Sequence, residues 1–555
     1  MTTAKKTYYI NEFNVSPSAA ECRADALEKV INSLPDDCEL VITRGKWMCK
    51  RRMFVRNKKN FVLRGEGATH LSHFCNSDLK GLDGAVGFEN CENITFKNFS
   101  FDCDVSPNMA GRVVAIDQEN GTFDLKIFDS FKVNGNELFE AFNTVDEEYT
   151  PEYKMVTYGD CRKEYLGNNT FRIMAKDSGI NMDGLHDGHL INIRHVKYGP
   201  ALITFEGVYG CTVEDITIHA SAGLTFLVNP RCSDFSFIRC KLILPENTDR
   251  IFTANADGMH IVGLTGKLYI KDCYFENLGD DALNMHSTAG TVADTYCEQN
   301  AFDCVYGRIN DRLEHLLGKD WAKPGDVLNI YEKESFEHIA SVKVLSYDGK
   351  RVEYEPIFGK FQKGNIVGNT AYYAETHLDG FNVYNTRARA FLFQTENILV
   401  ENCHIYGMSG CAMILSPDIR VWHEVGPCKN VVIRNNLIEK CGYSKSPSNI
   451  GSIAIKCCHD AGLTDSPAGV HENITIENNV FKNIGDSAIF ALAVDGLKVI
   501  NNRYENCSCN RFSEEIDSLK YDVAIKNCNN VTLSGNSSDR DEAFALYLDN
   551  VTDMK

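Results

Sequence analysis

The sequence contains no apolar run close to the roughly 20 residues that a transmembrane helix needs, so we expect no membrane partner. Its polar first residues are not followed by the apolar segment of a signal peptide. We therefore expect a cytoplasmic protein, with an exported protein whose leader has been removed as the alternative. No two cysteines have Cys-x-x-Cys spacing, which argues against a zinc ribbon, and no EF-hand or nonapeptide calcium motif is present.

Basic residues are too few to balance the acidic ones: 57 Lys and Arg stand against 76 Asp and Glu, a net charge of -19. An acidic surface repels phosphate backbones and polyanionic polysaccharides, so we expect no nucleic-acid partner. Cysteine is abundant, with 22 residues, and many of them recur at similar places in repeated segments. We expect these thiols to be reduced and buried as small apolar side chains, with disulfides as the alternative.

A short pattern repeats along the chain: a polar residue, then alternating apolar positions, then Asn or Cys. Copies begin at Asn93, Thr212, Asn397, Asn430, Asn473 and Asn530. Such alternation predicts short strands. A second pattern is a small residue followed by alternating apolar residues, and its copies begin at Ala201, Gly223, Gly258, Ala282, Ala390, Ala412 and Ala488. Several of these spacings are 22 or 24 residues, which fits one turn of a parallel β-helix.

These repeats predict an all-β protein, a right-handed parallel β-helix solenoid. Residues 22–33 have the pattern of an amphipathic helix, which we expect to cap the open end of the solenoid. Two stretches break the repeat, and we expect them to be inserted β domains resembling small barrels. The predicted segments are 1–105 (cap and first turns), 106–180 (first insertion), 181–289 (β-helix with the candidate site), 290–380 (second insertion) and 381–555 (C-terminal turns).

Aligning the copies of the second pattern on their small residue places the other side chains in columns. The position after the small residue is apolar in every copy, so this face is expected to point into the core. The opposite face is apolar in the outer copies and polar in the middle ones, at His260, Asn284, His286 and Gln394. This profile indicates a polar site with covered flanks.

The residue before the small one is Asp257 in one copy and Asp281 in the next, with Asp280 beside it. Neighbouring strands lie about 4.8 Å apart, so these carboxylates should cluster, which is unfavourable unless they have a function. Clustered carboxylates can supply the acid and the base of glycoside hydrolysis. The alternatives are a calcium site and aspartates that hydrogen-bond the backbone of their turns.

Around these aspartates the sequence resembles glycoside hydrolase family 110. The similarity is carried by Phe252–His260, Phe275–His286, Asn385–Ala390 and Trp422–Gly426, within a resemblance over roughly residues 20–500. Members of this family are α-1,3-galactosidases on a β-helix with inserted β-barrels, and they act by inversion without a metal. The resemblance implies an exo-acting enzyme that removes terminal α-linked galactose from blood-group B type or linear α-1,3-galactose glycans. It also implies an oligosaccharide or glycoconjugate glycan as the partner, no cofactor and no metal site.

The resemblance implies a role for each matching residue. Asp257, Asp280 and Asp281 would be the catalytic carboxylates, with Asp281 or Asp280 as the general acid and Asp257 activating the water. The substrate-binding residues would be His260, Asn284, His286, Arg389, Trp422 and Glu424. A homo-oligomer is a further possibility.

Other functions remain open at this point. Gly279, Asp280 and Asp281 also resemble the Gly-Asp-Asp element of the polygalacturonases of family 28, although the Gly-His-Gly and Arg-x-Lys elements of that family are missing. A polygalacturonase-like hydrolase, another α-glycosidase on a β-helix, or a uronan lyase or epimerase is therefore an alternative. Outside the enzymes, the alternative is a non-catalytic glycan-binding β-helix, which would not need three clustered carboxylates.

Overall fold

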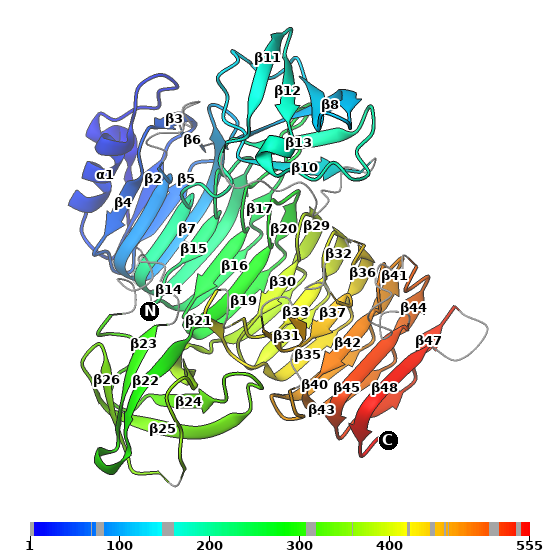
Figure 1. Ribbon diagram of the computed structural model, residues 1–555. Helices are drawn as coiled ribbons and strands as arrows, with labels where there is room; N and C mark the ends of the chain where they lie inside the picture. The colour runs from blue at the N-terminus through cyan, green and yellow to red at the C-terminus, as the bar shows by residue number, and fades with distance from the viewer. Residues whose placement is uncertain are drawn as a thin grey trace.

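The chain folds into a long parallel β-helix in the computed structural model. A single sheet system of 34 strands runs from the N-terminal to the C-terminal end of the molecule, blue to red in Figure 1. The predicted fold class is confirmed. Within the described residues, no helix is long and apolar enough to cross a membrane. The structure describes residues 5–67, 69–73, 83–146, 160–306, 318–357, 359–418, 422–443, 450–459, 462–463, 466–509, 521–539 and 545–555.

Strands of successive turns stack in parallel and build the face that carries the candidate site. Along this face Met259 lies opposite Leu283, and Leu283 lies opposite Phe391. The register is therefore the one expected from the alignment of Gly258, Ala282 and later copies. The strands involved, in order, are β15 (Phe226–Val228), β18 (Met259–Val262), β21 (Leu283–Thr288), β30 (Phe391–Phe393) and β33 (Met413–Leu415).

The first two copies of the second pattern are displaced from that alignment. Ile203 and Phe226 are the residues that share a row with Met259. Ala201 and Gly223 therefore sit one and two residues out of register with Gly258. Both segments carry apolar residues at odd and even positions alike. No alternation of polar and apolar residues therefore shows which side chains face the core.

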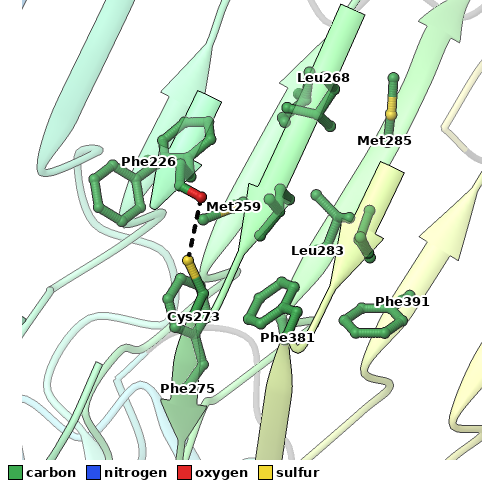
Figure 2. Packing of buried hydrophobic residues seen from close by; sticks show 14 of the residues in the cluster. Phe226, Met259, Leu268, Cys273, Phe275, Leu283, Met285, Phe381 and Phe391 are labelled. Carbon is green, nitrogen blue, oxygen red and sulfur yellow. Dashed lines mark hydrogen bonds between the residues drawn. The ribbon is translucent and has the colours of Figure 1, made fainter. Parts of the chain in front are cut away.

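The inner face of these strands forms a continuous apolar core directly beneath the candidate site. Figure 2 shows Met259, Leu283 and Phe391 pointing toward Phe275 and Phe381 of the neighbouring faces. The ring centroids of Phe275 and Phe381 are 4.8 Å apart in an edge-on contact. This packing fixes the backbone from which the polar residues of the outer face project.

The recurring cysteines are part of this interior, as expected. Each is buried and in no disulfide, and burial raises the pKa of several of their thiols. They include Cys91, Cys211, Cys232, Cys273, Cys403 and Cys428. The Cys273 thiol, for example, donates to the Phe237 carbonyl at 3.6 Å.

The Asn residues of the first pattern mark the corners of the β-helix. Asn93 and Asn98 both have left-handed backbones, with φ of 54° and 62°. Asn tolerates this conformation better than other side chains because its short amide bonds locally. The same holds for the pairs Asn397 and Asn402, Asn430 and Asn435, and Asn473 and Asn478. Asn397 and Asn402 bracket the four-residue strand β31 (Ile398–Glu401), whereas β7 (Val86–Cys103) runs on through both Asn93 and Asn98.

A helix covers the N-terminal end of the solenoid. Helix α1 spans Ala24–Ser33, inside the predicted 22–33. Its buried face, with Leu27, Val30 and Ile31, joins the core of the first turns. The sheet edge at this end is therefore covered, as the amphipathic pattern predicts.

The first insertion is an open antiparallel sheet, beside the β-helix at the top of Figure 1. The insertion ends at Arg194, so the predicted boundary near residue 180 is wrong. The strand Leu190–Arg194 belongs to the insertion, but it is buried throughout and its composition resembles that of a β-helix strand. The expected barrel-like form is not seen here among the described residues. In sheet order the strands are β10 (Ala141–Val145), β13 (Leu190–Arg194), β8 (Asn108–Asp117), β9 (Thr122–Ile127), β12 (Thr170–Met174) and β11 (Lys163–Gly167).

The second insertion is a closed barrel that begins directly after the site strand β21. Its apolar interior includes Phe302, Trp321 and Tyr354. In barrel order the strands are β22 (Gly290–Tyr296), β23 (Ala301–Tyr306), β26 (Arg351–Tyr354), β25 (His338–Tyr347), β24 (Val327–Tyr331) and β27 (Ile366–Asn369).

Candidate active site

Three aspartates meet at the turns that lead into two adjacent strands. Asp257 precedes β18, and Asp280 and Asp281 precede β21. The backbone of these turns is tied together, since the Gly258 amide donates to the Asp281 carbonyl at 2.9 Å. One oxygen from each of the three carboxylates lies within 4.8 Å of the others. The clustering expected from the repeat is thus present.

Asp281 is the most enclosed of the three carboxylates. Both of its oxygens are bound by Arg389, from Nε to Oδ1 and from Nη2 to Oδ2, each at 2.7 Å. Burial raises the pKa of Asp281 to about 6, although the arginine counteracts this. A carboxyl with such a pKa exchanges its proton close to neutral pH, as a general acid must.

Asp280 is held in its ionised form. Arg387 Nη2 lies 3.0 Å from Oδ1, and the Tyr198 hydroxyl donates to Oδ2 at 2.6 Å. Burial alone raises the pKa of Asp280, but the cations of Arg387 and Arg389 outweigh it, so this pKa lies below its ordinary value. Arg387 is itself fixed by a hydrogen bond from Nε to the Gly279 carbonyl.

Asp257 is the first member of a chain of buried polar side chains. Its Oδ2 is 2.7 Å from His260 Nδ1, and His260 Nε2 is 3.2 Å from His286 Nε2. His286 Nε2 is in turn 3.4 Å from Glu424 Oε1, and Glu424 Oε2 accepts a 2.6 Å hydrogen bond from Gln394 Nε2. These side chains therefore connect strands β18 and β21 with β34 (Glu424–Val425) and with Gln394, which directly follows β30.

Burial sets the protonation of this chain. It lowers the pKa of His286 to about 3, so His286 is neutral, and it raises the pKa of Glu424 to about 7. For His260, burial lowers the pKa, but the hydrogen bond to Asp257 outweighs this and the pKa is raised. Burial also raises the pKa of Asp257, against the effect of His260.

Two predicted substrate-binding residues differ in their exposure. Asn284 lies opposite His260 on the neighbouring strand, and its buried Oδ1 has no hydrogen-bond partner among the described residues. A buried acceptor of this kind is suited to a sugar hydroxyl. Trp422 is 61% exposed, two residues before Glu424, so its ring is accessible to a ligand rather than part of the core.

The aspartates are also the only group with metal-binding spacing in the described part of the chain. Both oxygens of Asp281 are already bound by Arg389, and both oxygens of Asp280 by Arg387 and Tyr198. A divalent cation would have to compete with two arginines at this position. The donor set therefore does not fit a resident metal, and its chemistry is that of paired acids and bases.

Several curated proteins that are similar to this chain in sequence are named α-1,3-galactosidases. The α-1,3-galactosidase B of Akkermansia muciniphila is 29% identical over 61% of this chain and 42% of its own length. The α-1,3-galactosidase B of Phocaeicola vulgatus is 24% identical over 90% of this chain and 92% of its own length. The α-1,3-galactosidase A of Shewanella woodyi is 23% identical over 80% and 73%. The chain is a homologue of the α-1,3-galactosidases.

These relatives confirm the family resemblance and the enzyme class, a glycosidase, that the sequence predicts. No protein-family model matches the chain. Among solved structures, a family 28 exopolygalacturonase of Yersinia enterocolitica is 12% identical, with a TM-score of 0.49, over 99% of this chain and 78% of its own.

The sequence does not reveal every residue of the site in this galactosidase homologue. Tyr198 lies just after the first insertion and outside every repeat, so no pattern marks it. Arg387 lies within the segment Asn385–Ala390 but off the aligned column, whereas its neighbour Arg389 is on it. Gln394 does stand out in the outward-facing column, and its contact with Glu424 gives it a place in the site.

Proposed function

We propose that the protein is an exo-acting α-1,3-galactosidase that hydrolyses terminal α-linked galactose in blood-group B type or linear α-1,3-galactose glycans. The observation that carries this proposal is the cluster of Asp257, Asp280 and Asp281 on one face of the β-helix, within 4.8 Å of one another. The names of the relatives support the sugar and the linkage.

In the proposed reaction a water oxygen attacks the anomeric carbon of galactose, and the bond from that carbon to the aglycone oxygen breaks. The aglycone oxygen takes its proton from the general acid, and the water proton passes to the base. Asp281 suits the acid, since its pKa is about 6 whereas that of Asp280 lies below its ordinary value. Asp257, hydrogen-bonded to His260, suits the base.

Inversion is part of the proposal, and it requires room for water between acid and base. The nearest oxygens of the three aspartates lie within 4.8 Å, closer than the separation of roughly 6.5–9.5 Å usual for inverting pairs. However, a retaining reaction would need Asp257 as the nucleophile, and the 2.7 Å hydrogen bond between its Oδ2 and His260 Nδ1 weakens that carboxylate as a nucleophile. The stereochemistry of the product therefore needs its own measurement.

The test is to incubate the protein with α-1,3-galactobiose and with α-1,4- and α-1,6-galactobiose, in the presence of EDTA. The proposal predicts galactose release from the α-1,3 substrate above all. Proton NMR during the first turnovers should show β-galactose first if the reaction inverts, and α-galactose first if it retains. No galactose release from any of the three substrates would contradict the proposed function.

A further inference from the structure

The hydrogen bonds from Asp257 through His260 to His286 have a defined direction. His286 Nδ1 is 3.2 Å from the Ser287 carbonyl oxygen, which can only accept, so Nδ1 carries the proton of this neutral ring. His286 Nε2 is then an acceptor, and the 3.2 Å contact with His260 Nε2 requires a proton on His260 Nε2. A second proton lies between His260 Nδ1 and Asp257 Oδ2, which are 2.7 Å apart.

This second proton has two possible places. On His260 it makes an imidazolium beside an ionised Asp257, and on Asp257 it makes a neutral carboxylic acid beside a neutral ring. Only the first arrangement leaves Asp257 able to take a proton from water. A negative charge on Glu424 favours the imidazolium through space, and Glu424 carries that charge at a pH above its pKa of about 7. Glu424 Oε1 lies 3.4 Å from His286 Nε2, but this nitrogen already accepts from His260, so the influence of the carboxylate is electrostatic and not a hydrogen bond.

We propose that Glu424, oriented by Gln394, is a positioning residue that keeps the shared proton on His260 and thereby keeps Asp257 ionised as the base. The inference rests on the proposed function of Asp257 and goes beyond it, because it removes Glu424 from the set of sugar ligands. Gln394 supports it through the 2.6 Å hydrogen bond from Nε2 to Glu424 Oε2, which stabilises the carboxylate over the acid.

The other charged groups near His260 and His286 do not supply the negative charge that Glu424 supplies. Asp257 and Asp281 also favour the imidazolium of His260, but Asp281 is neutralised by Arg389. Around Glu424, His260 and Arg389 favour its ionised form, while Asp418 opposes it. Because His286 is neutral, the charge of Glu424 is not cancelled by its immediate neighbour.

The first test is spectroscopic and needs no activity. Proteins labelled with ¹⁵N-histidine are compared as wild type, Glu424→Gln and Gln394→Leu at a pH above the pKa of Glu424, which is about 7. In wild type, both nitrogens of His260 should carry protons. In Glu424→Gln the pKa of His260 should fall by about one unit or more, and Gln394→Leu should shift it in the same direction by less. Unchanged His260 signals in Glu424→Gln, with His260→Gln used for assignment, would overturn the proposal.

The second test separates positioning from sugar binding. In Glu424→Gln, kcat on α-1,3-galactobiose should fall about tenfold or more, the factor that one pKa unit represents, while KM changes little. A rise in KM with an unchanged kcat would instead make Glu424 a sugar ligand and overturn the proposal. If wild type releases no galactose, the proposed function fails, and the NMR result still decides this inference.

A matched control is available in the same fold. Glu439 Oε2 lies 2.6 Å from His404 Nε2, where β36 (Leu437–Cys441) stacks on β32 (His404–Met408), on another face of the β-helix. Glu439→Gln removes the same kind of carboxylate from a histidine, but it should leave the His260 signals and kcat unchanged. Circular dichroism of all variants shows whether each one is folded.

Discussion

Arg389 binds Asp281 through two parallel hydrogen bonds, from Nε to Oδ1 and from Nη2 to Oδ2, each 2.7 Å long. Two effects therefore compete at this carboxyl: burial raises its pKa to about 6, and the guanidinium limits that rise. The balance between them sets the pH at which Asp281 gives up its proton. Changing Arg389 should accordingly move the pH dependence of the enzyme.

We expect Arg389→Met to shift the basic limb of the kcat/KM profile to higher pH. Without the guanidinium the pKa of Asp281 rises above about 6, so the acid stays protonated over a wider pH range. The maximal rate should fall, because the carboxyl is less firmly oriented. Arg434→Met, which removes a cation from Glu401 on another face, is the control and should leave the profile in place. An unshifted profile in Arg389→Met would mean that another group titrates.

Asp281→Asn should affect natural and activated substrates differently. A general acid matters most when the leaving group is a poor one, so the variant should lose about 100-fold or more on α-1,3-galactobiose. On p-nitrophenyl α-galactoside, whose leaving group needs little protonation, the loss should be clearly smaller. Equal losses on both substrates would assign Asp281 a role other than proton donation.

The contribution of Asp486 to the stability of the fold should fall as pH rises from about 4 through about 7. Asp486 is buried, and burial raises its pKa to about 7, so the folded state binds more protons than the unfolded state in this range. Asp486→Asn should remove this part of the loss and raise the free energy of unfolding at pH 8 by up to about 4 kcal/mol. Urea unfolding at pH 5 and pH 8 measures it, with the exposed Asp553→Asn as control. The idea fails if the variant keeps the full pH dependence of wild type.

A ladder of buried asparagines crosses the C-terminal turns. Asn436 Nδ2 donates to Asn479 Oδ1 at 2.9 Å, and Asn479 Nδ2 donates to Asn502 Oδ1 at 3.0 Å. Asn479→Ala removes the acceptor of the Asn436 backbone N–H and a donor to the Ile433 carbonyl, so it should cost about 2–4 kcal/mol of unfolding free energy. Chemical denaturation measures the loss, and Thr475→Ala on the half-buried outer side of an adjacent strand should cost much less. A loss equal to that of the control would show that the ladder is not stabilising.

The sequence predicts the column that holds Asp257 and Asp281 because two copies of the repeat show which residues align. Gly258 and Ala282 each follow an Asp and precede an apolar residue, and the strands pair in that register. At Ala201 and Gly223 the register is not marked in this way, since no Asp precedes them and apolar residues occupy odd and even positions alike. Strand register there is set by backbone hydrogen bonds between turns, which composition does not encode.

The partners of the aspartates are harder to predict than the aspartates. Arg389 shares the aligned column and is found from it, whereas Tyr198 reaches Asp280 from a segment far away in sequence. Glu424 and Gln394 meet only because β34 crosses the outer face antiparallel to β21. Such contacts depend on how a loop returns to the β-helix, and no local pattern records that path.

The most direct test of the central claim compares galactose release from α-1,3-galactobiose by wild type and by Asp257→Asn. Wild type should release galactose, and the variant should be slower by about 1,000-fold, because an amide cannot accept the water proton. Release that is undiminished in the variant would contradict the placement of catalysis in this aspartate cluster, and no release by wild type would contradict the galactosidase function itself.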